Sequence, residues 1–299
     1  MFQKILACTD GSSYSIDAVE MAAILASKLH AEIKVLSVFS TYYAEPAYLG
    51  VWAFTIPQES IDASIQAQHR EIEAQTKPVF ERLGITGETL QETGHPADCI
   101  VEVAKREHSD LIVMGSRGMG SFKSLLLGSV SDAVLHHAHC PVLILHGEHD
   151  AHKAEGLKRI LLATDGSEGS SKAAHAALSL AQKFETPLTV VNVFEPFLPL
   201  PEMASAEGQS EQTHDSLSAR VLEVVCQQIR SAAQEYGVVV SVFQERGDPA
   251  ESLVRFADEH QFDLIVMGSR GLGTFKSLLL GSVSHRIAHH AHCPVLIVR

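Results

Sequence analysis

The sequence predicts an α/β fold in which two tandem, doubly wound domains each contain a parallel sheet. Two observations lead to this prediction: the chain repeats itself, and strand-like apolar runs alternate with helix-like segments inside each repeat. The segment MGSRGMGSFKSLLLGSVS at residues 114–131 returns as MGSRGLGTFKSLLLGSVS at 267–284. Likewise, KILACTDGS at 4–12 corresponds to RILLATDGS at 159–167.

The first repeat shows the expected elements in order, alternating strand and helix. Continuous apolar runs such as DLIVM are typical of a strand that is buried on both faces. Ile16, Val19, Ala23 and Ala26 recur at helical spacing. We expect strands at 4–8, 32–39, 88–93, 110–116 and 141–146, and helices at 13–29, 59–83, 97–107 and 124–137.

The repeats define the domain organisation. We expect one domain at residues 1–146, a second at 157–299, and the polar linker GEHDAHKAEG at 147–156. The two copies are more alike over residues 110–145 and 263–298 than over their first strands and helices. This imbalance indicates that both second halves do the same job, and gene conversion is an alternative cause of it.

Composition excludes several classes of protein. The net charge of −13 argues against nucleic acid or an anionic membrane as a partner. No apolar run approaches the roughly 18 residues of a membrane span, and the N-terminus reaches acidic and turn residues too early for a signal peptide. The five cysteines are odd in number and form no CxxC pair, which favours a reduced, cytoplasmic setting.

Two turns with ligand-binding chemistry stand at the carboxyl ends of expected strands, where open α/β sheets bind ligands. Gly115 and Gly118 would let the backbone approach a ligand closely. Gly128 and Ser129 open the next helix, whose free N–H groups and positive dipole end favour phosphate. The other candidates are the hydroxyl of Ser131, the positive charges of Arg117 and Lys123, and Asp10 for a ribose hydroxyl or a divalent cation.

The second repeat carries every one of these candidates, at Asp165, Gly268, Arg270, Gly271, Lys276, Gly281, Ser282 and Ser284. Other phosphate motifs fit poorly. Walker A requires glycine directly before Lys-Ser, where Phe122 and Phe275 stand. The order GxxGxG after the fourth strand also differs from the dinucleotide fingerprint. Two intact copies, each paired with a TDGS strand end, favour a nucleotide site over an ordinary turn.

These TDGS strand ends and the spacing G-x2-G-x9-G-[ST] resemble the universal stress protein family in its tandem, two-domain form, nucleotide-binding branch. The resemblance covers nearly the whole chain. It implies a five-stranded parallel sheet of order 3-2-1-4-5 in each domain, with ATP, or ADP or AMP, between strands one and four. Mg²⁺ or Mn²⁺ is the candidate cation beside the phosphates.

The resemblance also implies site residues: phosphate contacts from the glycine loop and helix start, base contacts from the backbone after strand two, and an aspartate near the ribose. In the first repeat these are Cys8, Thr9, Asp10, Val38, Met114, Gly115, Ser116, Arg117, Gly118, Gly128, Ser129, Val130 and Ser131. In the second they are Ala163, Thr164, Asp165, Val193, Met267, Gly268, Ser269, Arg270, Gly271, Gly281, Ser282, Val283 and Ser284. Family members pair their fifth strands, which implies an intramolecular pseudo-dimer or a further homodimer.

The segment HHAHC, at residues 136–140 and again at 289–293, is an alternative metal site. Histidines also complement a helix C-terminus, and the family commonly carries histidine-alanine before its cysteine-proline pair. We therefore assign no metal ligands and keep a metal-handling interaction module as an alternative.

Catalysis has little support in the sequence, because Asp10 and Asp165 are lone carboxylates and no pyrophosphatase loop SGGxDS is present. A slow ATPase or autokinase is the alternative. Residues 41–57 and 195–212 differ most between the repeats and are candidate lids or surfaces for an unidentified protein partner. The expected function is a cytoplasmic, nucleotide-dependent stress-response sensor or signalling module.

Overall fold

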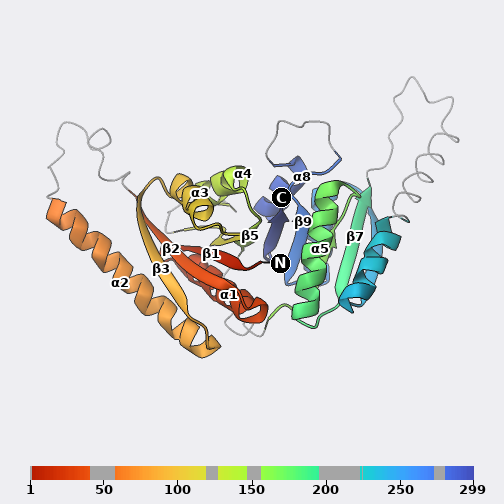
Figure 1. Cartoon of the computed structure of the whole chain (residues 1–299). Coiled ribbons are helices and arrows are strands. Elements are labelled where there is room, and N and C mark those ends of the chain that lie inside the picture. Colours follow the sequence, from red (N-terminus) through yellow and green to blue (C-terminus); the bar gives the residue numbers. More distant parts are fainter. Residues whose placement is uncertain are drawn as a thin grey trace, which may run out of the picture. The chain divides into compact units, whose positions relative to one another are not determined.

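The computed structural model describes residues 2–40, 58–118, 127–146, 156–194, 223, 225–272 and 280–299. The chain forms two compact units, unit 1 at Met1–Gly156 and unit 2 at Leu157–Arg299. Figure 1 colours them from red to blue along the sequence. The expected loops at 41–57 and 195–212, and the expected linker apart from Gly156, lie outside the described residues.

Unit 1 alternates strand and helix from its first strand to its last. Its strands are all parallel and lie in the order β3-β2-β1-β4-β5, so the predicted order 3-2-1-4-5 is confirmed. The elements are β1 (Lys4–Thr9), α1 (Ser13–Leu29), β2 (Glu32–Ser40), α2 (Gln58–Leu83), β3 (Gly87–Gly94), α3 (Pro96–Arg106), β4 (Leu111–Gly115), α4 (Ser129–His137) and β5 (Val142–Leu145).

Helices cover both faces of this sheet. α1 packs with α2 on one face, and α3 packs with α4 on the other (Figure 1). β4 is buried along its whole length, as the DLIVM run predicts. Leu6 of β1 and Val113 of β4 have no exposed surface. The two central strands therefore form a rigid base for the loops that follow them.

The start of α4 differs from the prediction. The expected helix 124–137 is wrong at residues 127 and 128, which are not helical. Gly128 has extended dihedral angles, φ −79° and ψ 157°, and acts as the N-cap of a helix that begins at Ser129. Its N–H donates to the carbonyl of Ser116 at 2.7 Å, which holds the chain against the end of β4 before the helix starts.

Unit 2 repeats the architecture, with parallel strands in the order β8-β7-β6-β9-β10. This is again the order 3-2-1-4-5 when its strands are counted along the chain. Residues 225–236 are also helical. The labelled elements are β6 (Ile160–Ala163), α5 (Glu168–Lys183), β7 (Leu188–Phe194), β8 (Val240–Arg246), α7 (Pro249–Glu259), β9 (Leu264–Gly268), α8 (Ser282–His290) and β10 (Val295–Val298).

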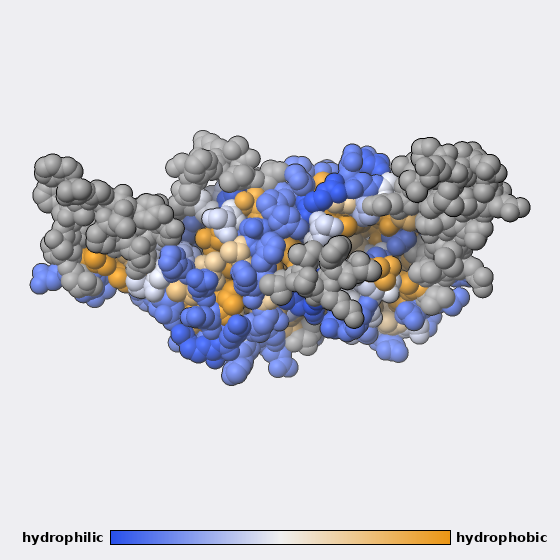
Figure 2. Space-filling view, turned by 90° about the horizontal axis from the view of Figure 1, so that it is seen from above, coloured by the Kyte–Doolittle hydropathy of each residue, from blue (hydrophilic) through white to orange (hydrophobic). Residues whose placement is uncertain are grey.

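Much of the described surface visible in Figure 2 is hydrophilic, with apolar patches between. The large apolar side chains most exposed in the described residues are Val239, Phe243 and Leu272. Of the helices that the structure describes, none combines the length and apolar character needed to cross a membrane.

Candidate functional site

In unit 1, two loops lie together at the carboxyl edge of the sheet because β1 and β4 are parallel neighbours. Their register pairs Cys8 with Met114, one residue before each strand ends. Thr9 and Asp10 therefore lie beside the loop that leaves Gly115. The predicted convergence of the TDGS turn and the glycine loop is seen in the structure.

The TDGS turn is held by its own hydroxyl and carboxylate groups. The hydroxyls of Thr9 and Ser15 are 2.9 Å apart, and the N–H of Gly11 donates to Thr9 Oγ1 at 3.1 Å. Asp10 Oδ1 accepts from the N–H of Ser12 at 3.0 Å and from its hydroxyl at 2.6 Å. Gly11 has φ +87°, a conformation that glycine adopts without strain. The Asp10 carboxylate is thus fixed in place by the turn.

Two glycines of the loop allow it to pack against this turn. A Cβ at Gly118 would lie 2.2 Å from Asp10 Oδ2, and a Cβ at Gly115 would lie 2.9 Å from the backbone carbonyl of Tyr14. Both distances are too short for a real Cβ. The sequence predicts that these glycines make room for a ligand. In the structure, the neighbouring turn already occupies the space where their side chains would lie.

The start of α4 is open to an anion. No side chain caps this helix, and Ser129 is exposed at its first position. The first N–H groups of a helix have no partner inside the helix and carry its positive dipole end. α5 and α7 are capped by the side chains of Ser167 and Asp248, whereas α1 and α3, like α4, have no side-chain cap.

Ser131 has a structural role in this arrangement. It is buried, and its hydroxyl lies 2.9 Å from the carbonyl of Gly115 and 3.2 Å from that of Ser116, to which it donates. Its proton therefore ties α4 to the end of β4 and is not presented to solvent. Ser129 is the hydroxyl at the helix start that faces outward. The Ser116 hydroxyl is buried and has no hydrogen-bond partner among the described residues.

Unit 2 rebuilds the same contacts. Thr164 Oγ1 donates to the hydroxyl of Ser170 at 3.1 Å, and Ser284 donates to the carbonyl of Ser269 at 2.9 Å. A Cβ at Gly271 would lie 2.3 Å from Asp165 Oδ2. That carboxylate oxygen also accepts from the N–H of Leu272 at 3.0 Å. The N–H of Gly281 donates to the carbonyl of Ser269 at 2.8 Å.

At the positions predicted to contact the base, the backbone extends beyond the end of the neighbouring strand. β1 ends at Thr9, opposite Ser37, whereas β2 continues to Ser40, so Val38 extends beyond its neighbour. In unit 2, the carbonyl of Val191 accepts from the N–H of Thr164. Backbone groups that face one neighbouring strand recur at every second residue, so Val193 faces the same side, past the end of β6.

The remaining predicted side chains form the floor of the site. Cys8, Met114, Ala163 and Met267 are all buried. Burial, with the neighbouring Cys140, raises the pKa of the Cys8 thiol far above its ordinary value. These residues therefore contribute backbone and shape, not reactive groups. Val130 and Val283 lie in the first turns of α4 and α8, and Lys123 and Lys276 lie outside the described residues.

Comparison of the two copies could have revealed one further pair. Ser15 and Ser170 follow the TDGS turns at the same distance, in TDGSSYS and TDGSEGS. Each contacts the threonine hydroxyl of its turn. The shared serine is the signal in the sequence, although the contact itself requires the fold.

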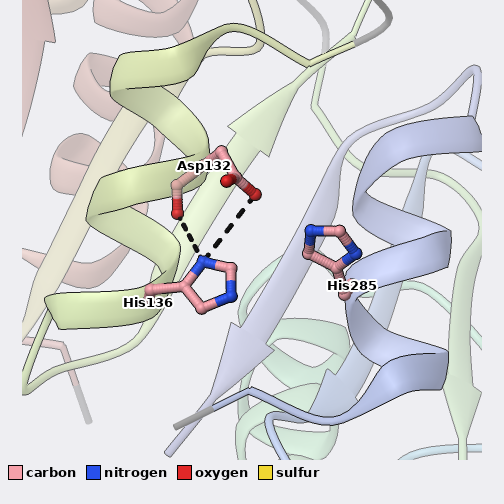
Figure 3. Close-up of side chains that lie close together, drawn as sticks. All are labelled: Asp132, His136 and His285. Atoms are coloured by element: carbon pink, nitrogen blue, oxygen red, sulfur yellow. Dashed lines mark hydrogen bonds and ion pairs between the residues drawn. The ribbon is translucent and has the colours of Figure 1, made fainter.

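The HHAHC segment of unit 1 does not gather around one point. His136 lies on α4, where its Nδ1 is 2.9 Å from the carbonyl of Asp132 and 3.7 Å from its carboxylate (Figure 3). His137 and His139 are exposed, whereas Cys140 is buried. The Cys140 thiol lies in the core and the His137 and His139 rings lie at the surface, as expected for a helix end that packs on a core.

Comparisons with known proteins agree with this architecture. The model of the universal stress protein family matches residues 1–146 and 156–299. A universal stress protein of Mycolicibacterium smegmatis is 32% identical over 302 residues, which span 99% of this chain and 96% of the relative. One from Methanocaldococcus jannaschii is 37% identical over 144 residues, 48% of this chain and 82% of that protein. The crystal structure of a universal stress protein from Archaeoglobus fulgidus superposes with a TM-score of 0.70 at 26% identity, covering 99% of this chain and 98% of that one.

Proposed function

Because the chain belongs to the universal stress protein family, we propose that each of its units binds one adenine nucleotide at the carboxyl edge of its sheet. ATP is the first candidate, with ADP and AMP as alternatives. The phosphates would lie between the glycine loop and the start of α4 or α8. The base would meet the backbone at Val38 or Val193, with Asp10 or Asp165 near the ribose.

The observation that carries this proposal is the uncapped start of α4 and α8 beside the described ends of the glycine loop. In both units a glycine N-cap provides no side-chain hydrogen bond to the first turn. At the described ends of the loop, Gly118 or Gly271 packs against the Asp10 or Asp165 carboxylate, and Gly128 or Gly281 donates a backbone hydrogen bond to the carbonyl of Ser116 or Ser269. Free N–H groups and a positive dipole end beside a glycine-rich segment are features that bind phosphate.

A divalent cation fits this site only as a companion of the nucleotide. Each unit offers one carboxylate at the loop, and Asp10 Oδ1 already accepts two hydrogen bonds from Ser12. Mg²⁺ keeps several waters and is commonly held by one or two carboxylates together with substrate phosphates. Mg²⁺ or Mn²⁺ would therefore be bound mainly by phosphate and water, with Asp10 or Asp165 nearby.

We further infer that binding serves signalling. We use the word cradle for the TDGS turn, the glycine loop and the start of α4 or α8 together. The Asp10 carboxylate orients the turn, and the hydroxyl of Ser131 is hydrogen-bonded to backbone carbonyls, so both groups stabilise the cradle of unit 1. Such a cradle can couple nucleotide occupancy to a surface that a protein partner reads. The chain would act in the cytoplasm as a nucleotide-dependent stress-response module.

The test is identification of the ligand. Untagged, purified protein is denatured and the released small molecules are analysed by mass spectrometry, while calorimetry titrates nucleotide-free protein with ATP, ADP and AMP in Mg²⁺. We expect up to two adenine nucleotides per chain and micromolar binding. Protein that carries no nucleotide and gives no binding heat at millimolar concentrations would overturn the proposal. Release of ADP from ATP above background would favour the slow ATPase instead.

A further inference from the structure

Arg117 and Arg270 occupy the same place in two identical GSRG loops, yet their surroundings differ. In unit 1, the guanidinium carbon of Arg117 lies 4.6 Å from the centroid of the Tyr14 ring, in a cation–π contact. The Nε of Arg117 is buried and has no hydrogen-bond partner among the described residues. In unit 2, Arg270 is exposed.

The cause lies outside the repeated loop. Aligning the TDGS turns places Gly169 of unit 2 where unit 1 has Tyr14. A Cβ at Gly169 would lie 2.7 Å from the carbonyl of Arg270, so the loop of unit 2 requires glycine there. Glycine offers no ring, and the guanidinium of Arg270 consequently has no such aromatic partner at this position.

The Tyr14 contact holds the Arg117 guanidinium against a side chain of α1. Tyr14 belongs to α1, which packs on the face of the sheet opposite α4. A phosphate at the start of α4 would compete with the Tyr14 ring for the guanidinium of Arg117. Among the described residues, Arg270 has no equivalent ring contact to lose, and a state that must be disrupted before binding lowers apparent affinity.

A second difference acts in the same direction. The first turn of α4 contains Asp132, whereas the first turn of α8 contains no acidic residue and has His285 at the matching position. Figure 3 shows Asp132 on α4, next to His136. An acid at a helix N-terminus is itself stabilised by the dipole, and it disfavours a second anion there.

We propose that the two nucleotide sites are not equivalent: unit 2 binds phosphate more tightly, and Tyr14 and Asp132 weaken the site in unit 1. The proposal rests on the function proposed above. A cation–π contact corresponds to about a twofold to tenfold change in affinity, and a charge at a helix end to about a twofold to fivefold change. Together they predict a difference of roughly fivefold to fiftyfold, so the chain would fill its sites over two ranges of nucleotide concentration.

Calorimetric titration with ATP and Mg²⁺ tests this in the unmodified chain and four variants. Ser129→Asp places a carboxylate at the exposed start of α4 and leaves unit 2 as the working site; Ser282→Asp does the reverse. We expect the Ser129→Asp protein to bind with the higher affinity. In the Ser282→Asp background, Tyr14→Ala should raise the affinity by about twofold to tenfold. In the same background, Tyr14→Phe keeps the ring and should leave the affinity unchanged.

The outcomes separate the two proposals. If neither the unmodified chain nor any variant binds an adenine nucleotide, the proposed function is wrong and the inference falls with it. If Ser129→Asp and Ser282→Asp proteins bind equally, or Tyr14→Ala leaves the affinity of unit 1 unchanged or lowers it, the sites do bind nucleotide but the inequality is wrong.

Discussion

The start of α4 and α8 offers a perturbation that separates ligand binding from folding. Ser129 is exposed at the first helical position of α4, after a glycine N-cap that provides no side-chain hydrogen bond. Ser282 holds the same position in α8. The double variant Ser129→Asp with Ser282→Asp places a negative charge where each phosphate would lie.

The same charge has opposite effects on the helix and on the ligand. A carboxylate near a helix N-terminus stabilises the helix by about 0.3–1 kcal/mol, so each unit should unfold no more easily than before. Against a phosphate about 5 Å away, at an effective dielectric constant of roughly 40–80, Coulomb repulsion is about 1–2 kcal/mol per charge. Two nearby phosphate charges give roughly 2–3 kcal/mol, a loss of about 30-fold to 150-fold in affinity.

The assay combines calorimetry with ATP and thermal unfolding in the absence of ligand. The matched control is Ser129→Asn with Ser282→Asn, which has nearly the same shape as the aspartate variant and no charge. We expect the asparagine protein to bind within a few-fold of the unmodified chain. Aspartate variants that are folded, equally stable and bind ATP with unchanged affinity would show that phosphate does not lie at these helix starts.

Two further predictions concern the contacts around the site. Gly118→Ala would bring a methyl group 2.2 Å from Asp10 Oδ2, so we expect a loss of about 1–3 kcal/mol in the free energy of unfolding of unit 1. Because Asp10 also holds Ser12, the same substitution is repeated in an Asp10→Gly background, where it should cost less; an equal cost in both backgrounds would mean that this overlap is not the cause. In unit 2, the Arg286 guanidinium, with the backbone N–H of Glu251, lowers the pKa of Asp248. The ionised Asp248 carboxylate therefore stabilises the fold above the ordinary carboxyl pKa, and this stabilisation is lost as the pH falls through the lowered pKa. Denaturation measured from about pH 2 to 6 should therefore show Asp248→Asn less stable near neutrality and equal to the unmodified chain in strong acid; a gap that stays constant with pH would contradict the assignment.

Most of the fold could be predicted from the sequence because the signals are local. The run DLIVM is buried along all of β4, and the alternation of strands and helices appears in both units. The order of the strands came from the family resemblance, since alternation alone permits several orders. The start of α4 was misplaced because the apolar residues before Gly128 look helical, while a backbone hydrogen bond to Ser116 keeps Gly128 extended.

The meeting of the TDGS turn and the glycine loop was predictable from the sequence, and the roles of their atoms were less so. Residue types identify glycine, serine and aspartate as candidates, but they do not say which atoms are already in use. Ser131 looks like a phosphate donor in the sequence, and in the structure its proton goes to a backbone carbonyl. Gly118 looks like a space for a ligand, and that space is filled by the Asp10 carboxylate. Such assignments depend on contacts that only the fold creates, between residues 16 positions apart for Ser131 and Gly115 and 108 apart for Gly118 and Asp10.

Identical loops do not make identical sites, because the environment of a loop is set by what packs against it. The copies agree over GSRG, and that agreement first indicated that both cradles do the same job. The residue that distinguishes them lies in the more divergent first halves, where Tyr14 meets Arg117 and Gly169 meets the backbone of Arg270. After a duplication, a single change at this position can alter the affinity of one cradle while both loop sequences stay the same.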